Sequence, residues 1–137
     1  MIKVDGKKIA ERIKGEIKTL LKDSGPKSLA IIYVGENPVI DSYVALKRRI
    51  GEELGIRVAV MRFPDDISET ELLGKISEAN DSFDGVIVQL PLPEGLRKEN
   101  ILNAVSTVKD VDVLSLTSAE MFASGTIAKM PPVVAAI

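Results

Sequence analysis

Apolar residues follow two different patterns along the chain, one typical of helices and the other of buried strands. Residues 7–22 carry apolar residues at helical spacing, which predicts an amphipathic helix. The turn-forming run Asp23-Ser24-Gly25-Pro26 stops this helix. Residues 29–34 (LAIIYV) then form a short continuous apolar run, which predicts a strand buried on both faces.

The same succession of helix and strand continues along the chain. The further predicted segments are a helix over 38–54 after the turn 35–38, a strand over 58–61, a helix from Ser68 to about Asn80, a strand over 84–89 and a helix over roughly 97–105. This alternation predicts an α/β fold, a three-layer α/β/α domain with a short parallel sheet covered on both faces. A fourth strand is expected at Ile2–Val4 or at Val111–Leu114.

Composition narrows the class of protein. The chain has 137 residues, the size of one domain with a real core, and its net charge of −2 is carried by well-mixed signs. Without a basic stripe, nucleic acid and anionic membranes are not expected partners. The sequence shows no apolar signal segment and no run of transmembrane length, so a cytoplasmic location is the default expectation.

The chain contains neither cysteine nor histidine, which restricts the chemistry available to it. A disulfide framework, a thiol nucleophile and a thiolate zinc site are excluded, and no metal site is expected. The usual general base and any Ser-His-Asp triad are excluded as well. Proton transfer must therefore use Lys, Asp, Glu or Tyr.

A lysine lies among apolar positions of the predicted helix 38–54. Helical projection places an apolar stripe on Val39, Tyr43, Leu46, Ile50 and Leu54, with Ile40 at its edge. Lys47 falls on the apolar arc between Leu54 and Ile40. An amine held among apolar groups has its charged form disfavoured, which moves it towards useful acid–base chemistry. The alternative is a lysine that simply extends its amine to water.

Polar residues at the carboxyl ends of the predicted strands are the second candidate group. Gln89 ends an apolar strand, and Asp110 and Asp112 follow the helix after it. Ligands of open parallel sheets bind beyond the carboxyl ends of the strands, so these groups are expected to converge with Tyr43 and Lys47. The alternatives are that Gln89 bonds its own loop, that Asp110 forms a turn and that Asp112 caps a helix.

Four segments, in this order, carry a resemblance to a known family: Val34-Gly35-Glu36-Asn37-Pro38, Tyr43-Val44-x-x-Lys47, Asp84 to Pro93 (DGVIVQLPLP) and Lys109-Asp110-Val111-Asp112. Along nearly all its length the chain resembles the N-terminal, folate-binding domain of bifunctional methylenetetrahydrofolate dehydrogenase/methenyltetrahydrofolate cyclohydrolase. The resemblance implies an amino-acid-dehydrogenase-like N-terminal domain. It makes residues 1–130 the folate-binding catalytic domain and 131–137 the start of an inter-domain helix.

The resemblance also implies roles for individual residues. Tyr43 would stack on the aminobenzoyl ring of the folate, and Lys47 would be the main catalytic group. Gln89 would contact and tune that lysine, which makes it a further catalytic residue.

Three more residues receive roles in the same way. Asp112, counted with the catalytic residues, would anchor the pterin ring. Val88 and Leu90, which flank Gln89, would line the substrate pocket.

This chain also departs from the family's pattern. Ile40 stands where a serine is usual, Val113-Leu114-Ser115-Leu116 where Gly-Phe-His-Pro is common, and Ser118 where an asparagine is usual. Met130-Pro131-Pro132-Val133 replaces a Pro-Cys-Thr-Pro-like segment. These differences concern the outer contacts of the pocket, whereas Tyr43, Lys47, Gln89 and Asp112 keep the family's residue types.

The activity that the resemblance implies belongs to one-carbon folate metabolism, which feeds purine biosynthesis. The longer enzyme would oxidise 5,10-methylenetetrahydrofolate with NADP and hydrolyse 5,10-methenyltetrahydrofolate to 10-formyltetrahydrofolate. NADP would be bound by the family's Rossmann-type domain, for which this chain shows no glycine-rich motif. The chain ends as the inter-domain helix would begin, which suggests a fragment unable to perform the dehydrogenase step alone.

Two other interpretations stay open at this stage. The chain is alternatively a non-catalytic module that binds a folate or a partner, or an inert truncated α/β domain whose site residues are idle. The family enzymes are homodimers through contacts largely in the other domain, so no dimer is assumed for this chain.

Overall fold

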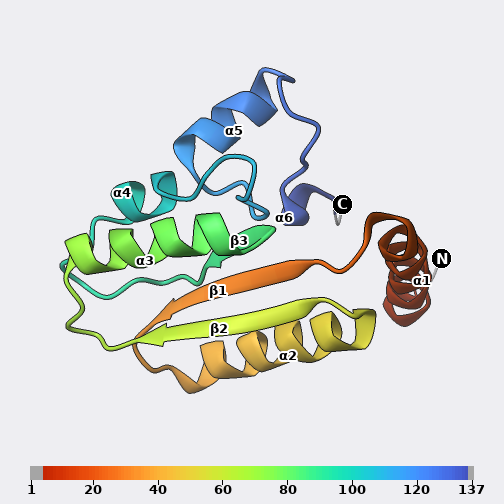
Figure 1. The fold of residues 1–137 in the computed structure, drawn as a ribbon, viewed down its shortest axis with the longest axis horizontal. Helices are drawn as coiled ribbons and strands as arrows, with labels where there is room; N and C mark the ends of the chain where they lie inside the picture. The colour runs from red at the N-terminus through yellow and green to blue at the C-terminus, as the bar shows by residue number, and fades with distance from the viewer. Residues whose placement is uncertain (1–4, 136–137) are drawn as a thin grey trace.

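Three parallel strands form the middle layer of the computed structural model, which describes residues 5–135 (Figure 1). In chain order the strands are β1 (Ser28–Val34), β2 (Arg57–Phe63) and β3 (Gly85–Val88). Their order in the sheet is β2-β1-β3, with Ile31 of β1 paired to Val60 on one side and to Ile87 on the other. The predicted parallel sheet and its three strands are confirmed.

Helices cover both faces of this sheet. Their bounds are α1 (Gly6–Ser24), α2 (Pro38–Leu54), α3 (Glu69–Ser82), α4 (Lys98–Asn103), α5 (Leu116–Ala123) and α6 (Pro132–Ala135). Figure 1 shows α2 on one side of the sheet and α3 with α4 on the other. The four helices predicted up to residue 105 are confirmed, whereas α5 was not predicted.

Alternate residues of each strand supply two separate cores. On the α2 side, Ile31, Tyr33 and Ile87 pack against Ile40 and Val44. On the α3 and α4 side the buried residues are Ala30, Ile32, Val34, Leu72, Ile76, Ala79, Val86, Val88, Ile101, Leu102 and Val105. The period of two along each strand thus divides its side chains between the two helical layers.

The buried face of α2 is rotated from the predicted apolar stripe. Val39 and Tyr43 expose 65% and 60% of their surface, and Leu46 exposes 41%. The buried positions are instead Ile40, Val44, Gly51 and Leu54. Lys47 lies three residues after Val44 and four before Gly51, so it belongs to the middle of the buried row rather than to its edge.

Close contact between α2 and β2 explains this rotation. A Cβ atom added to Gly51 would come within 2.3 Å of Val58 Cγ2 on β2, so the helix touches the strand where it has no side chain. Apolar periodicity does not register this contact, because glycine contributes no hydrophobic side chain to the pattern. The predicted stripe was therefore wrong.

The loop before α2 is held by hydrogen bonds at the carboxyl end of β1. The Asn37 side chain accepts from the backbone N–H groups of Val39 (3.0 Å) and Ile40 (3.3 Å) and caps the helix. The buried Tyr33 hydroxyl accepts from Asn37 N at 2.8 Å and donates to Asn37 O at 3.2 Å. Gly35 supplies the positive φ of 82° that the turn requires.

The fourth strand expected at Val111–Leu114 is absent from the described residues, and this prediction was wrong. Only Asp110 pairs with the sheet, through a single parallel bridge to Val86. The chain then turns, with Val113 at a φ of 56°. The other candidate, Ile2–Val4, lies outside the described residues.

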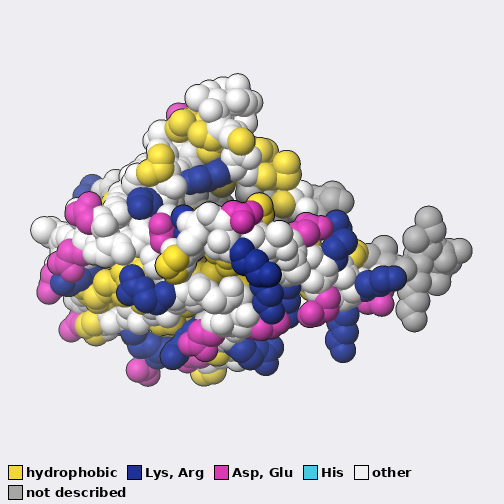
Figure 2. Space-filling view, turned by 45° about the vertical axis from the view of Figure 1, so that its right-hand side comes forward, with side chains coloured by type: hydrophobic (Ala, Val, Ile, Leu, Met, Phe, Trp, Pro, Cys, Tyr) yellow, Lys and Arg dark blue, Asp and Glu magenta, His cyan; other side chains and the backbone are white. Residues whose placement is uncertain are grey.

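The remaining helices lie at the margins of the fold. Beside the amino ends of β1 and β2 stands α1, which has no buried residue and contacts α2 through an ion pair of 3.0 Å between Lys14 and Glu53. Charges of both signs are interspersed over the face seen in Figure 2, and apolar side chains gather on the projection that carries α5. Within residues 5–135, none of the helices is long and apolar enough to cross a membrane.

Replacing Gly51 by alanine tests the contact between α2 and β2. The added methyl group must displace Val58, so we expect Gly51→Ala to lower the free energy of unfolding by about 1–3 kcal/mol. Gly74 in α3 has nothing within 4 Å of an added Cβ, and Gly74→Ala should raise this free energy by about 0.5–1 kcal/mol. Urea unfolding measures both, and equal stabilisation by the two changes would contradict the packing.

Candidate active site

Lys47 and Gln89 meet on the α2 side of the sheet. Lys47 Nζ donates a hydrogen bond of 3.1 Å to Gln89 Oε1. Gln89 in turn donates from Nε2 to the Leu90 carbonyl at 3.1 Å, which turns its amide oxygen towards the lysine. Gln89 N donates to Ile32 O at 2.8 Å, so the residue stays anchored to β1 just beyond the end of β3.

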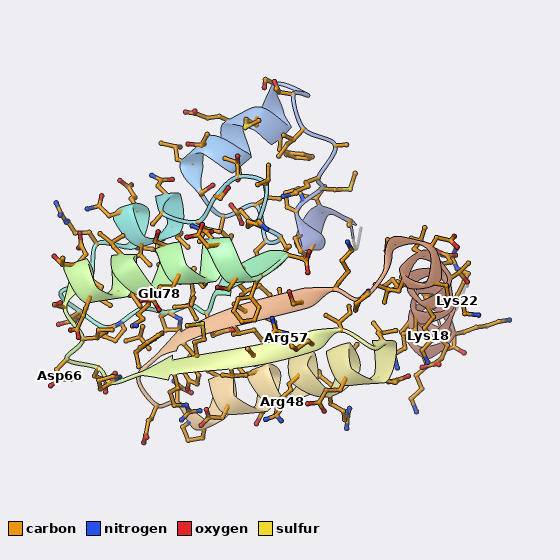
Figure 3. The ribbon with its side chains drawn as sticks, viewed as in Figure 1. Lys18, Lys22, Arg48, Arg57, Asp66 and Glu78 are labelled. Atoms are coloured by element: carbon orange, nitrogen blue, oxygen red, sulfur yellow. The ribbon has the colours of Figure 1, made fainter. Side chains whose placement is uncertain are left out.

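The inward direction of Lys47 contrasts with that of the next residue on the helix. Arg48 projects away from the sheet (Figure 3) and pairs with Glu52 at 2.8 Å. Lys47 is half-buried and has a protein partner for its amine, unlike a lysine that only extends to water. The structure therefore holds the lysine on the inner face of α2, in keeping with its predicted place among apolar positions of the helix.

Asp112 approaches the same lysine from the segment between α4 and α5. Burial raises the pKa of the Asp112 carboxyl above its usual value. The positive charge of Lys47 opposes this rise, and the negative charge of Asp110 adds to it. The Asp112 carboxyl is thus a half-buried acid that faces an amine from another element. The alternative that Asp112 caps a helix is wrong, because Ser115 caps α5.

Asp110 has a different role from its neighbour. It is only 4% exposed, and its carboxylate accepts from the backbone N–H groups of Leu114 (3.4 Å) and Ser115 (3.0 Å). Burial alone would raise its pKa, but hydrogen bonds from Ser115, Ser118 and Leu114 outweigh burial and hold the pKa below its usual value. Asp110 therefore forms a turn, which was one of the alternatives left open in the sequence analysis.

Of the other predicted site residues, one lies beside Lys47 and two lie on the opposite face of the sheet. Tyr43 lies one turn before Lys47 on α2 with an exposed ring. Val88 is buried in the core beneath α3 and α4, and Leu90 packs against the same core. The structure therefore brings Lys47, Gln89 and Asp112 together beside Tyr43, but it directs Val88 and Leu90 to the opposite face of the sheet.

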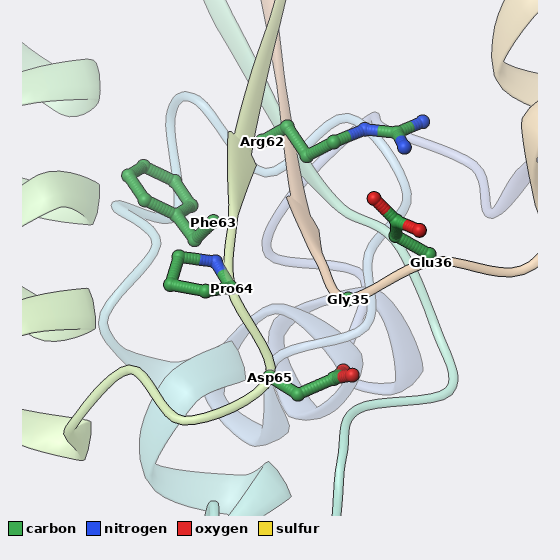
Figure 4. Close-up of a pocket in the computed structure, with 6 residues that line it drawn as sticks. All are labelled: Gly35, Glu36, Arg62, Phe63, Pro64 and Asp65. Carbon is green, nitrogen blue, oxygen red and sulfur yellow. The ribbon is translucent and has the colours of Figure 1, made fainter.

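A cavity of about 410 Å³ lies nearby, at the carboxyl ends of β1 and β2. It is lined by Gly35, Glu36, Arg62, Phe63, Pro64 and Asp65, as Figure 4 shows. A neighbouring cavity of about 170 Å³ shares Glu36 and Asp65 with it. Neither of these two cavities is lined by Lys47, Gln89 or Asp112.

The charges around these cavities do not suit a phosphate group. Arg62 is occupied, since it pairs with Asp41 and stacks over the Tyr33 ring with its Cζ 4.6 Å from the centroid. The Glu36 and Asp65 carboxylates face the space beside Gly35. Asn37 already satisfies the first free N–H groups of α2, which are the groups a dinucleotide phosphate would use. These two cavities and the N-terminus of α2 therefore do not fit the phosphates of NADP.

Sequence reasoning missed two features around the site. The helix α5 was signalled by Ser115 at its N-cap and by Gly125 just after its end, a recognisable pair of boundary residues. The buried contact between Ser115 Oγ and Ser118 Oγ, of 2.8 Å, had no such signal, because serines are common on surfaces. Within residues 5–135 no group of three acidic side chains is placed to hold a metal ion.

Comparison with known proteins identifies what the fold and the site are similar to. The model of the family "Tetrahydrofolate dehydrogenase/cyclohydrolase, catalytic domain" matches residues 4–112. The bifunctional protein FolD of Campylobacter jejuni is 42% identical over 118 residues, which make up 82% of this chain and 42% of that protein.

Solved structures agree with this match. The crystal structure of the Campylobacter jejuni FolD methylenetetrahydrofolate dehydrogenase/cyclohydrolase has a TM-score of 0.84 at 36% identity, covering 93% of this chain and 48% of that one. The Trypanosoma brucei enzyme, complexed with NADP cofactor and inhibitor, has a TM-score of 0.79 at 25% identity over 88% of this chain and 43% of that one. The chain spans less than half the length of these relatives.

Removing the amine of Lys47 tests its proximity to Asp112. Because the Lys47 charge lowers the pKa of Asp112, we expect Lys47→Met to raise that pKa further. A pH titration of the Asp112 side-chain carboxyl by NMR measures the change. Arg48→Met removes a cation from the outer face of the same helix and should leave the titration unaltered. An identical Asp112 titration in wild type and Lys47→Met would contradict the arrangement.

Proposed function

Because the chain belongs to the tetrahydrofolate dehydrogenase/cyclohydrolase family, we propose that it binds a reduced folate and contributes the folate-side catalytic groups of this enzyme. The hydrogen bond between Lys47 Nζ and Gln89 Oε1, beside Asp112, is the observation that carries the proposal. In this proposal residues 1–130 act as the folate-binding catalytic domain and residues 131–137 begin an inter-domain helix. The substrates are 5,10-methylene- and 5,10-methenyltetrahydrofolate.

Folate binding uses the two ends of the site. The exposed Tyr43 ring offers a flat surface on which the aminobenzoyl ring stacks. The Asp112 carboxyl offers hydrogen bonds to the amino group and ring nitrogens of the pterin. Lys47 lies between these two groups, so the one-carbon bridge of the folate is brought to its amine. Val88 and Leu90 support the site from the opposite face of the sheet, since they fix the strand end that carries Gln89.

Hydrolysis of the methenyl bridge requires proton transfers at defined positions. Water loses a proton as its oxygen bonds to the bridging carbon, and a ring nitrogen gains a proton as its bond to that carbon breaks. The Lys47 amine serves both transfers, and Gln89 holds the amine in place between them. Fixing the amine before the substrate arrives lowers the entropic part of the barrier.

The dehydrogenase step needs a nicotinamide cofactor, and the phosphates of such a cofactor do not fit the two cavities or the N-terminus of α2 described above. We propose NADP as the cofactor of the complete enzyme, in line with the Trypanosoma brucei relative described with NADP. Its binding groups would lie in the part of the relatives that this chain does not span. The chain alone is therefore expected to lack the dehydrogenase activity.

The biological setting follows from this function. We propose a cytoplasmic enzyme of one-carbon metabolism that supplies purine biosynthesis and acts on a small folate rather than on nucleic acid or membrane. The complete enzyme would be a homodimer, with no dimer assumed for this chain. The second candidate is a folate-binding module without turnover, which the exposed ring of Tyr43 supports by itself.

Hydrolysis of 5,10-methenyltetrahydrofolate by the purified chain, followed by absorbance, tests the proposal. We expect slow turnover above background and a loss of about 10²-fold or more in Lys47→Met, the size of a general acid–base contribution. Arg48→Met is the matched control, since it removes a neighbouring cation that points away from the sheet. Folate binding with no turnover in either protein would favour the non-catalytic module, and no binding would favour an inert domain.

A further inference from the structure

The segment that carries Asp112 is attached to the sheet just before it reaches the site. Val86 N donates to Lys109 O at 2.8 Å, and Lys109 Nζ donates to Phe83 O at 2.7 Å. The Val111 side chain rests on Gly85, where an added Cβ would lie only 2.9 Å from Val111 Cγ1. These contacts fix the path of the chain up to residue 111, but they do not reach Asp112 itself.

Beyond Asp112 the chain closes on the buried Asp110. The Asp110 carboxylate accepts from the N–H groups of Leu114 and Ser115, so residues 110–115 form a loop with Asp112 near its tip. Within that loop the buried Val113 has a φ of 56°, a left-handed conformation that a β-branched residue rarely adopts. A strained backbone persists only where surrounding contacts hold it in place, and the Asp110 hydrogen bonds supply that restraint.

The two aspartates differ in what surrounds them. Asp110 receives backbone and hydroxyl donors, and the Lys129 amine, bonded to Thr107 O at 2.8 Å and Val108 O at 2.6 Å, adds a nearby positive charge. Asp112 faces Lys47 from α2 and Asp110 from its own loop. Asp112 has no hydrogen-bond partner in the part of the chain that the structure describes, which leaves its oxygens for a ligand.

We propose that Asp110 is a positioning residue of the site: its buried carboxylate closes the 110–115 loop and thereby fixes the position of the Asp112 carboxyl near Lys47. Asp110 acts on Asp112 through the loop that its hydrogen bonds close and through its negative charge. The role of this positioning in catalysis rests on the function proposed above, whereas the effect of Asp110 on Asp112 does not.

The effect on Asp112 is measured without folate. We expect Asp110→Asn to weaken the closure, expose Asp112 to water and remove a nearby negative charge, and each of these changes lowers the pKa of Asp112 towards its usual value, as followed by NMR titration of the carboxyl. Asp66→Asn, in the exposed loop after β2 (Figure 3), removes a distant carboxylate and should leave this pKa unaltered. An unchanged Asp112 titration in folded Asp110→Asn would overturn the proposal.

A second pair of variants separates loop closure from the charge of Asp110. Ser115 has a φ of −68°, which proline adopts, so Ser115→Pro removes the N–H that bonds Asp110 while the carboxylate stays. Ser115→Ala keeps that N–H and loses only the hydroxyl. We expect the pKa of Asp112 to fall more in Ser115→Pro than in Ser115→Ala. Equal values in the two variants would contradict closure through Asp110.

The consequence for catalysis is measured in a separate experiment. If the chain hydrolyses 5,10-methenyltetrahydrofolate, we expect Asp110→Asn to lower kcat/KM by about 100-fold, as a small displacement of a substrate-orienting group does. A shifted Asp112 titration with full activity would overturn the catalytic part of the proposal. Absence of turnover in wild type would count against the proposed function alone, because the Asp112 titration still decides whether Asp110 positions it.

Discussion

The close approach of α2 to the sheet determines the geometry of the site. Gly51 allows the helix to touch β2, and Ile40 and Val44 then fill the space above β1 and β3. With the helix fixed in this rotation, Lys47 lies on its inner face and reaches Gln89 at 3.1 Å. A rotation by one residue would place Arg48 there instead, so the amine at the site is a consequence of packing.

The polar groups around that amine are of two kinds: some are held by hydrogen bonds within the protein, and others are accessible to a ligand. Gln89 is held by the Leu90 carbonyl, and Asp110 is held by N–H groups of its own loop. Asp112 and Tyr43 keep free surfaces for a ligand. A folate has an aromatic middle and a polar pterin end, and these two open groups match that order along the site.

The sequence predicted elements whose signals are local and failed where distant contacts decide. Continuous apolar runs located the three strands of the described sheet, and the helix predicted over 38–54 after the turn 35–38 has the bounds of α2. The rotation of α2 was mispredicted because Gly51 contributes packing without hydrophobicity. Val111–Leu114, within the loop that Asp110 closes, was one of the two positions expected for a fourth strand, since its apolar residues do not reveal that a buried carboxylate bends the backbone.

The central claim is that a folate lies along the inner side of α2, from Tyr43 to Asp112. Chemical-shift mapping by NMR during titration with tetrahydrofolate tests it most directly, since each group at the site has its own signal. We expect the largest changes at the Tyr43 ring, the Gln89 side-chain amide and the backbone around Asp112. Changes confined to the cavity beside Gly35 and Asp65, or none at saturating folate, would contradict the account.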